Sequence, residues 1–107
     1  MRFAEDKIKS LMGFAVKAGK VLYGTDNIVE TKRKKYLIAV CRTISDRSLK
    51  RITETCAITV IRCKYADLGE ILHKDNCKAV ALLDRQMAEA AVNSINYDLY
   101  DLVSEGK

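Results

Sequence analysis

"YLIAVC", residues 36–41, is a short run in which every side chain is hydrophobic. A run of this length is typical of a strand that is covered on both faces, because neither face then needs polar side chains. Two further runs also predict strands: "AITVI" at 57–61 is rich in β-branched residues, and "AVALL" at 79–83 is again wholly apolar. A shorter run at 21–23 completes a set of four expected strands.

Helices are expected to alternate with these strands. The first is predicted over residues 5–17, where apolar side chains recur at the spacing of one helical face: Ile8, Leu11, Met12 and Ala15. Others are expected from a Thr25 cap to near Lys34, from a Ser45 cap, over residues 66–72, and from an Asp84 cap. This alternation predicts the α/β class, with a sheet lying between layers of helices.

The chain is expected to form one domain over residues 1–107. For the segment 96–107 the pattern leaves two interpretations open, a loose tail or an extension of the last helix. No apolar run approaches the roughly 18 residues of a membrane span, and charged residues interrupt the N-terminal stretch. We therefore expect a cytoplasmic protein with no membrane partner.

Positive charge is concentrated in the first part of the chain. The formal net charge is +5, whereas residues 1–43 carry ten Lys or Arg against four Asp or Glu, a balance of +6. Such a surface favours a polyanionic partner, because phosphate contacts release counterions. A well-solvated surface with no such partner would give the same composition.

Neither the cysteines nor the glycines form a catalytic or metal-binding pattern. Cys41, Cys56, Cys63 and Cys77 lack the spacing of a zinc knuckle, and His73 is the only histidine. We expect buried, reduced thiols and no metal site. The sequence has no phosphate loop, dinucleotide fingerprint or nucleophile elbow. It therefore predicts a protein without a cofactor that is not an enzyme.

The segment after the first expected strand is the best candidate for a binding surface. Gly24 permits close approach of a backbone, and the free N–H groups of the next turn can donate to phosphates or base edges. Asp26 and Asn27 lie in that turn. Four cations are expected to flank the site: Lys20, Lys32, Arg33 and Lys34. The alternative is that the glycine merely turns the chain and the next residues cap a helix.

Two longer segments carry a resemblance to a known family. They are "SLMGFAVKAGKVLYGTDN" at 10–27 and "ADLGEILHKDNCKAVALLDRQMAEA" at 66–90. With the α/β alternation they resemble the kink-turn-binding ribosomal proteins of the L-seven-Ae and L-thirty-e type, and most closely their bacterial YlxQ-type relatives. The resemblance covers roughly residues 8 to 95. It implies a three-layer α/β/α sandwich with a mixed sheet of about four strands.

The resemblance also implies an RNA-binding edge made of two surfaces. The first would read sheared G·A pairs and comprises Gly24, Thr25, Asp26, Asn27 and Glu30, with Lys20 beside it. The second would pack on an extruded nucleotide and comprises His73, Lys74, Asp75 and Asn76. Three positions depart from the family pattern, in which asparagine, glutamate and lysine stand where this chain has Asp26, Asn27 and Glu30. Lys32 or Arg33 would then take over the cationic role.

These observations together predict a non-catalytic RNA-binding protein. The resemblance implies association with the ribosome, a structured, kink-turn-like RNA as ligand, and a protein partner within a ribonucleoprotein. The acidic substitutions at the expected RNA surface support an alternative from another class. In that alternative the chain is a protein-interaction module that keeps the fold and has lost kink-turn recognition.

Overall fold

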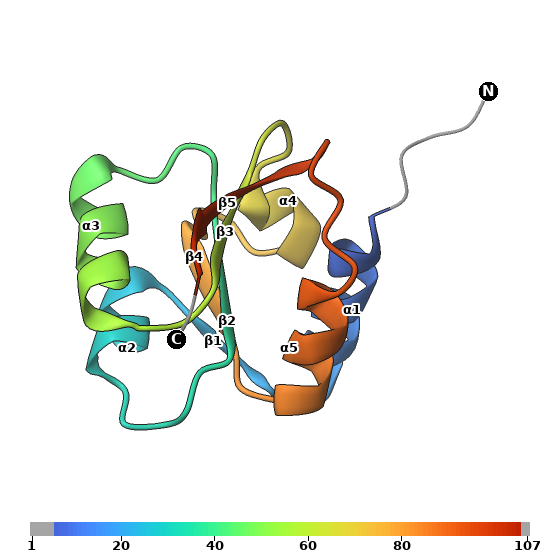
Figure 1. Cartoon of the computed structure of the whole chain (residues 1–107), viewed down its shortest axis with the longest axis horizontal. Coiled ribbons are helices and arrows are strands. Elements are labelled where there is room, and N and C mark those ends of the chain that lie inside the picture. Colours follow the sequence, from blue (N-terminus) through green and yellow to red (C-terminus); the bar gives the residue numbers. More distant parts are fainter. Residues whose placement is uncertain (1–5, 106–107) are drawn as a thin grey trace.

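Five helices and five strands alternate along the part of the chain that the computed structural model describes, residues 6–105 (Figure 1). In chain order they are α1 (Lys7–Lys17), β1 (Val21–Tyr23), α2 (Thr25–Glu30), β2 (Leu37–Val40), α3 (Asp46–Thr55), β3 (Val60–Cys63), α4 (Leu68–Leu72), β4 (Ala79–Leu82), α5 (Arg85–Val92) and β5 (Tyr100–Ser104). The expected helix start at residue 5 and both ends of the expected 1–107 domain lie outside the described residues.

The five strands form one mixed sheet in the order β1-β4-β2-β3-β5. β2 and β3 are parallel, with Ile38 opposite Val60, and the other three pairs are antiparallel. β1 and β2 both run antiparallel to their common neighbour β4 and therefore point the same way. The segments that follow these two strands must consequently lie at the same edge of the sheet.

Helices cover both faces of the sheet, which gives the three layers seen in Figure 1. Helices α1, α4 and α5 lie on one face, and α2 and α3 lie on the other. Side chains of β2 alternate between the two cores: Leu37 and Ala39 face the first, Ile38 and Val40 the second. All four are buried, as are all four residues of β4. The continuous hydrophobic character of these strands follows from burial on both faces.

The predicted α/β class is confirmed, including helices on both faces of a mixed sheet. The sheet has one strand more than the expected four or so, because residues 100–104, for which a loose tail and a helix extension were both left open, form β5 and pair with β3. In that strand Tyr100 is buried. β5 forms because it pairs with β3, which is distant in the sequence, so the local hydrophobic pattern around residue 100 could not reveal it.

Element ends differ from the expectation in two places. Helix α2 ends at Glu30, where Thr31 is already extended, so the cations that follow lie in a loop and not in a last helical turn. Strand β3 begins at Val60, later than the expected start at Ala57. Among the described residues, no helix combines the length and the apolar character needed to cross a membrane.

The predicted caps of the two long later helices are confirmed. Ser45 Oγ accepts from the Ser48 N–H at 3.1 Å, and Asp84 Oδ1 accepts from the Met87 N–H at 2.9 Å. Such contacts satisfy N–H groups that the helix leaves unpaired. Thr25, by contrast, is not the cap of α2. Gly24 occupies that position without a side-chain hydrogen bond.

Candidate nucleic-acid interface

The turn between β1 and α2 depends on Gly24. Its backbone has φ 90° and ψ 142°, a conformation that side chains with a Cβ rarely adopt. The Gly24 N–H donates to Ala79 O at 2.9 Å, and its carbonyl accepts from Ile28 N at 3.0 Å. A Cβ at this position would have a single neighbour within 4 Å, Asn27 Nδ2 at 3.9 Å. The backbone is therefore held from within the protein while its other side is open to a ligand.

A second turn, residues 73–76, joins α4 to β4. His73 and Asn76 both have left-handed backbones, with φ 54° and 58°. Gly69 allows the turn to fold back on α4, because a Cβ there would approach Lys74 O to 2.6 Å. Non-glycine residues in this conformation need support from the surrounding structure. The close packing of the turn on Gly69 provides that support.

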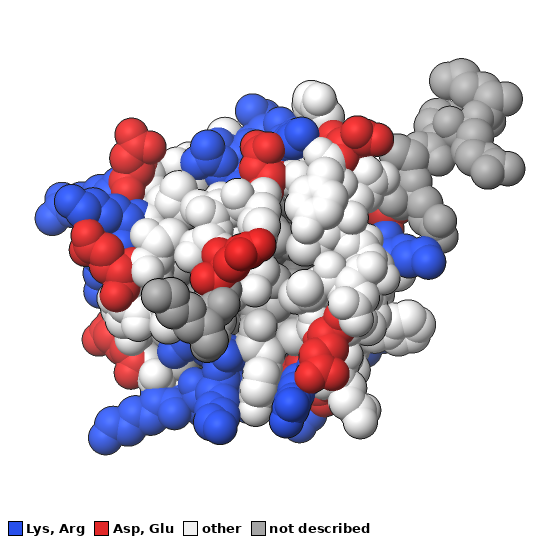
Figure 2. Space-filling view, viewed as in Figure 1, with Lys and Arg blue, Asp and Glu red and all other residues white. Residues whose placement is uncertain are grey.

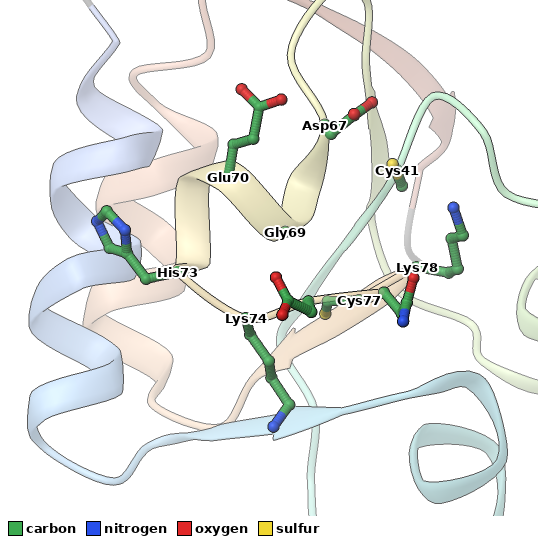
Figure 3. A pocket seen from close by; sticks show the side chains of 10 residues that line it. Cys41, Asp67, Gly69, Glu70, His73, Lys74, Cys77 and Lys78 are labelled. Atoms are coloured by element: carbon green, nitrogen blue, oxygen red, sulfur yellow. The ribbon is translucent and has the colours of Figure 1, made fainter.

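These two turns line one groove of about 660 Å³, which we call the glycine groove. The loop between β2 and α3 forms its remaining wall. The Lys74 ammonium lies 4.7 Å from the centroid of the Tyr23 ring, a cation–π contact that connects one turn to the strand leading into the other. In Figure 3 the Lys74 side chain extends from its turn toward β1. The two surfaces expected from the sequence are therefore brought together at one sheet edge.

The structure does not place every predicted site residue in this groove. Six of them line it: Gly24, Thr25, Asn27, Lys74, Asp75 and Asn76. His73 points away toward α1 and lines a separate hollow with residues of that helix (Figure 3). Glu30 is the exposed last residue of α2, at the end remote from Gly24.

Asp26 and Asn27, which differ from the pattern of the resembled family, both have partners within the protein. The Asp26 carboxylate forms an ion pair with the Arg51 guanidinium, which projects from α3. Asn27 Nδ2 donates to Tyr23 O at 3.0 Å. The pair with Arg51 offsets the negative charge that would otherwise repel phosphates at this turn.

The cations expected to flank the groove lie at the opposite edge of the sheet. Lys20 O accepts from Leu83 N at 2.8 Å, just beyond the C-terminal end of β4. Gly24 N donates instead to Ala79 O, at the N-terminal end of β4. Tyr36, which follows the cation run, donates through its N–H to Leu82 O at 3.0 Å. Lys20 and Gly24 are four steps apart along extended chain, a distance of about 13 Å. The expectation that these cations flank Gly24 is therefore not met.

Other groove residues were not expected from the sequence. Thr43, Ser45, Ser48 and Lys78 line the groove, and Lys78 Nζ donates to Thr43 Oγ1 at 2.7 Å. β1 and β2 point the same way on either side of β4, so the loop after β2 lies at the same edge of the sheet as the turn after β1. Recognising that β1 and β2 run parallel would have pointed to the residues after Cys41.

A second hollow of about 460 Å³, drawn in Figure 3, shares the wall formed by residues 74–78 with the groove. Cys41 lines it but is only 2% exposed. Burial opposes ionisation of this thiol, but hydrogen bonds from Thr43 and the Leu68 N–H, with Lys78 nearby, bring its pKa below the ordinary value. All four cysteines are buried and free, as expected. Within residues 6–105, no three His, Cys, Asp or Glu side chains are grouped to hold a metal ion.

Comparison with known proteins supports the fold. No family model matches the chain, and no curated protein matches it. The structure is similar, with a TM-score of 0.74, to a solved structure of a protein of unknown function from Bacillus halodurans C. That similarity covers 83% of this chain and 96% of the other, at 20% sequence identity. At this identity the likeness shows a shared α/β fold.

Proposed function

We propose that this chain is a non-catalytic RNA-binding protein that holds a structured, kink-turn-like RNA in the glycine groove. In this proposal it acts in the cytoplasm, associated with the ribosome as part of a ribonucleoprotein. The observation that carries the proposal is the meeting of two separate turns, at Gly24 and at Lys74–Asn76, in one groove. Each turn contributes a different kind of contact to a folded nucleic acid.

The Gly24 turn suits the approach of a base edge or phosphate. Its backbone is open, and donors and acceptors of Asn27 and Thr25 lie on the adjacent turn. RNA with non-canonical pairs presents base edges that such groups can reach. The shape of this turn comes from backbone conformation, so it does not depend on the identity of Asp26.

The opposite wall supplies positive charge and a ring. Lys74 and Lys78 both line the groove and are exposed. Tyr23, which is half-buried and directly precedes Gly24, has the Lys74 ammonium over its ring, so a base stacks on that face when Lys74 moves from the ring to a phosphate. Lysines contact phosphates, and aromatic rings stack on unpaired bases. The wall therefore suits an RNA with an unstacked nucleotide.

The test is a titration of the purified chain with a fluorescent kink-turn RNA and with a matched RNA whose tandem G·A pairs are replaced by Watson–Crick pairs. We expect tighter binding of the kinked RNA, and binding of both that weakens as salt rises. Gly24→Ala and Gly24→Val share the backbone strain, but valine adds bulk to the open side. The valine variant should therefore bind the kinked RNA more weakly than the alanine variant does.

Three outcomes decide between RNA recognition by the glycine groove and the protein-interaction module. A preference for the kinked RNA that Gly24→Val removes, with circular dichroism unchanged, supports the groove as the reading surface. Equal binding of both RNAs by the wild type and by both Gly24 variants contradicts it. Binding to neither RNA favours the protein-interaction module, and a protein partner recovered after nuclease treatment would then identify its function.

A further inference from the structure

Five cations gather at the sheet edge opposite the glycine groove. They come from the turn before β1 and the loop between α2 and β2, and we call them the basic edge: Lys20, Lys32, Arg33, Lys34 and Lys35. Figure 2 shows the blue side chains of this loop at the lower left of the molecule. The backbone hydrogen bonds from Leu83 to Lys20 and from Tyr36 to Leu82 hold both segments at the end of β4.

The charges of the basic edge are not neutralised by the protein. Lys20, Lys32, Arg33 and Lys34 are exposed, and Lys35 is half-buried. Within residues 6–105, none of the five forms an ion pair, whereas Arg42, Arg51 and Arg85 all do. The acidic residues at this edge include Glu30, Asp84 and Glu105, which follows the end of β5, and Asp84 is directed to its own helix as a cap. The edge therefore carries a clear excess of positive charge.

The glycine groove differs in its charge. Lys74 and Lys78 are accompanied there by Asp75, and Asp26 nearby is already paired with Arg51. The strongest attraction for a polyanion is thus at the basic edge and not at the groove. A separation of about 13 Å along β1 exceeds the reach of a lysine side chain, so the cations at one edge cannot contact phosphates seated at the other.

We propose that the basic edge is a second RNA-binding surface, which contacts the sugar–phosphate backbone of an RNA duplex independently of the glycine groove. Four consecutive cations outside regular structure can adjust to phosphates without reading base edges. The large exposed hydrophobic residues, Phe14, Tyr65, Val92, Tyr97 and Leu102, all lie on other elements. Within residues 6–105, the loop that carries the four consecutive cations therefore presents no large exposed apolar side chain of the kind with which a basic surface inserts into lipid.

Two surfaces at opposite edges would allow one protein to contact two RNA segments. An RNA seated in the groove would leave the basic edge available to a neighbouring helix. The inference goes beyond the proposed function, because it requires no recognition of G·A pairs. It would stand even if the groove bound no kinked RNA.

The experiment uses a labelled RNA duplex made only of Watson–Crick pairs, titrated at salt concentrations from about 50 to 200 mM. The variant Lys32→Gln/Arg33→Gln/Lys34→Gln should weaken binding about tenfold or more at low salt. It should also reduce the slope of the logarithm of the binding constant against the logarithm of the salt concentration by about two. A matched variant, Lys7→Gln/Lys9→Gln/Lys50→Gln, removes the same number of charges from exposed positions on α1 and α3. It should change the affinity by less than about threefold, because those lysines are remote from the basic edge.

Two controls separate this inference from the proposed function. The variant Lys32→Gln/Arg33→Gln/Lys34→Gln should keep the wild-type ratio between the affinities for the kinked RNA and for its Watson–Crick counterpart, since the groove is unaltered. If the two triple variants weaken duplex binding equally, general charge and not the basic edge is responsible, and the inference is overturned. It is also overturned if the wild type binds vesicles of anionic lipid but no duplex RNA.

Discussion

The phenolic hydroxyl of Tyr100 donates to both carboxylate oxygens of Asp6, at 2.9 and 3.1 Å, across 94 positions of sequence. Asp6 Oδ1 also accepts from the Lys9 N–H at 2.9 Å and so caps α1. One carboxylate therefore fixes the start of the first helix and holds the last strand of the sheet. This contact joins the last strand of the sheet to the first helix of the domain.

Tyr100→Phe should lower the free energy of unfolding by about 1–2 kcal/mol, because a hydrogen bond to a charged group is lost while water partly replaces it. The ring itself stays buried, so no cavity forms. Urea denaturation of the two proteins measures the difference. Tyr97→Phe is the matched control, since Tyr97 is 55% exposed, and it should change stability little. Equal effects of the two substitutions would contradict a special role for the Asp6 contact.

The domain should lose stability at alkaline pH because of two buried groups. Burial raises the pKa of the Cys63 thiol from 9.0 to about 12, and burial together with the Asp6 hydrogen bond raises the pKa of Tyr100 above its usual value. Above pH 9 the unfolded chain therefore releases protons that the folded chain retains. The stabilisation is fully present below pH 9 and decreases as the pH rises toward 12.

Cys63→Ala tests this dependence. The variant should be less stable than the parent at neutral pH, because it loses buried volume, but its stability should fall less steeply above pH 9. Urea denaturation at several pH values gives both slopes. An unchanged slope would show that the Cys63 thiol does not contribute to the alkaline loss.

The ion pair between Arg51 and Asp26 should matter more for RNA binding than for folding. Both side chains are largely exposed, so Arg51→Ala should cost less than about 1 kcal/mol of stability. The same change leaves the Asp26 carboxylate uncompensated beside the glycine groove, and binding of the kinked RNA should weaken several-fold. Adding Asp26→Asn should restore binding, because the repulsive charge is then removed. A double variant that binds no better than Arg51→Ala would refute this role.

Gly69 and Gly13 provide a matched pair for testing the loop that lines the groove. Gly69→Ala would bring a Cβ to 2.6 Å from Lys74 O, and the substitution should cost about 1–3 kcal/mol while displacing residues 74–76. Gly13 lies in α1 with no atom within 4 Å of an added Cβ. Gly13→Ala should therefore stabilise the protein, by up to about 1 kcal/mol, through improved helix propensity.

Thermal denaturation and amide exchange of residues 73–77 distinguish the two glycine variants. Faster exchange in this loop is expected for Gly69→Ala alone. If both alanine variants leave the loop unchanged, the close approach of the turn to α4 does not hold it in place.

Much of the fold could be predicted from local sequence. Continuous hydrophobic runs located β2 and β4, the helical spacing of Ile8, Met12 and Ala15 located α1, and Ser45 and Asp84 marked helix starts by their capping chemistry. These signals work because side-chain periodicity and N-terminal capping involve residues within a turn or two of one another. The α/β class followed from the alternation alone.

The tertiary structure decided which of these segments meet. Strand β5 is held by the hydrogen bond from Tyr100 to Asp6 and by pairing with the edge of β3. Both partners are distant in the sequence, so the residues near position 100 do not reveal them. Arg51 reaches Asp26 only because α2 and α3 pack on the same face.

Strand direction had the largest consequence for the candidate site. The glycine turn and the cation run are neighbours in sequence, and the sequence therefore grouped them into one site. The chain crosses the sheet between them, so they lie at opposite edges. Composition and local motifs determine most of the helices and strands, whereas long-range pairing and burial, which set strand order and direction, determine the fifth strand and which elements share a surface.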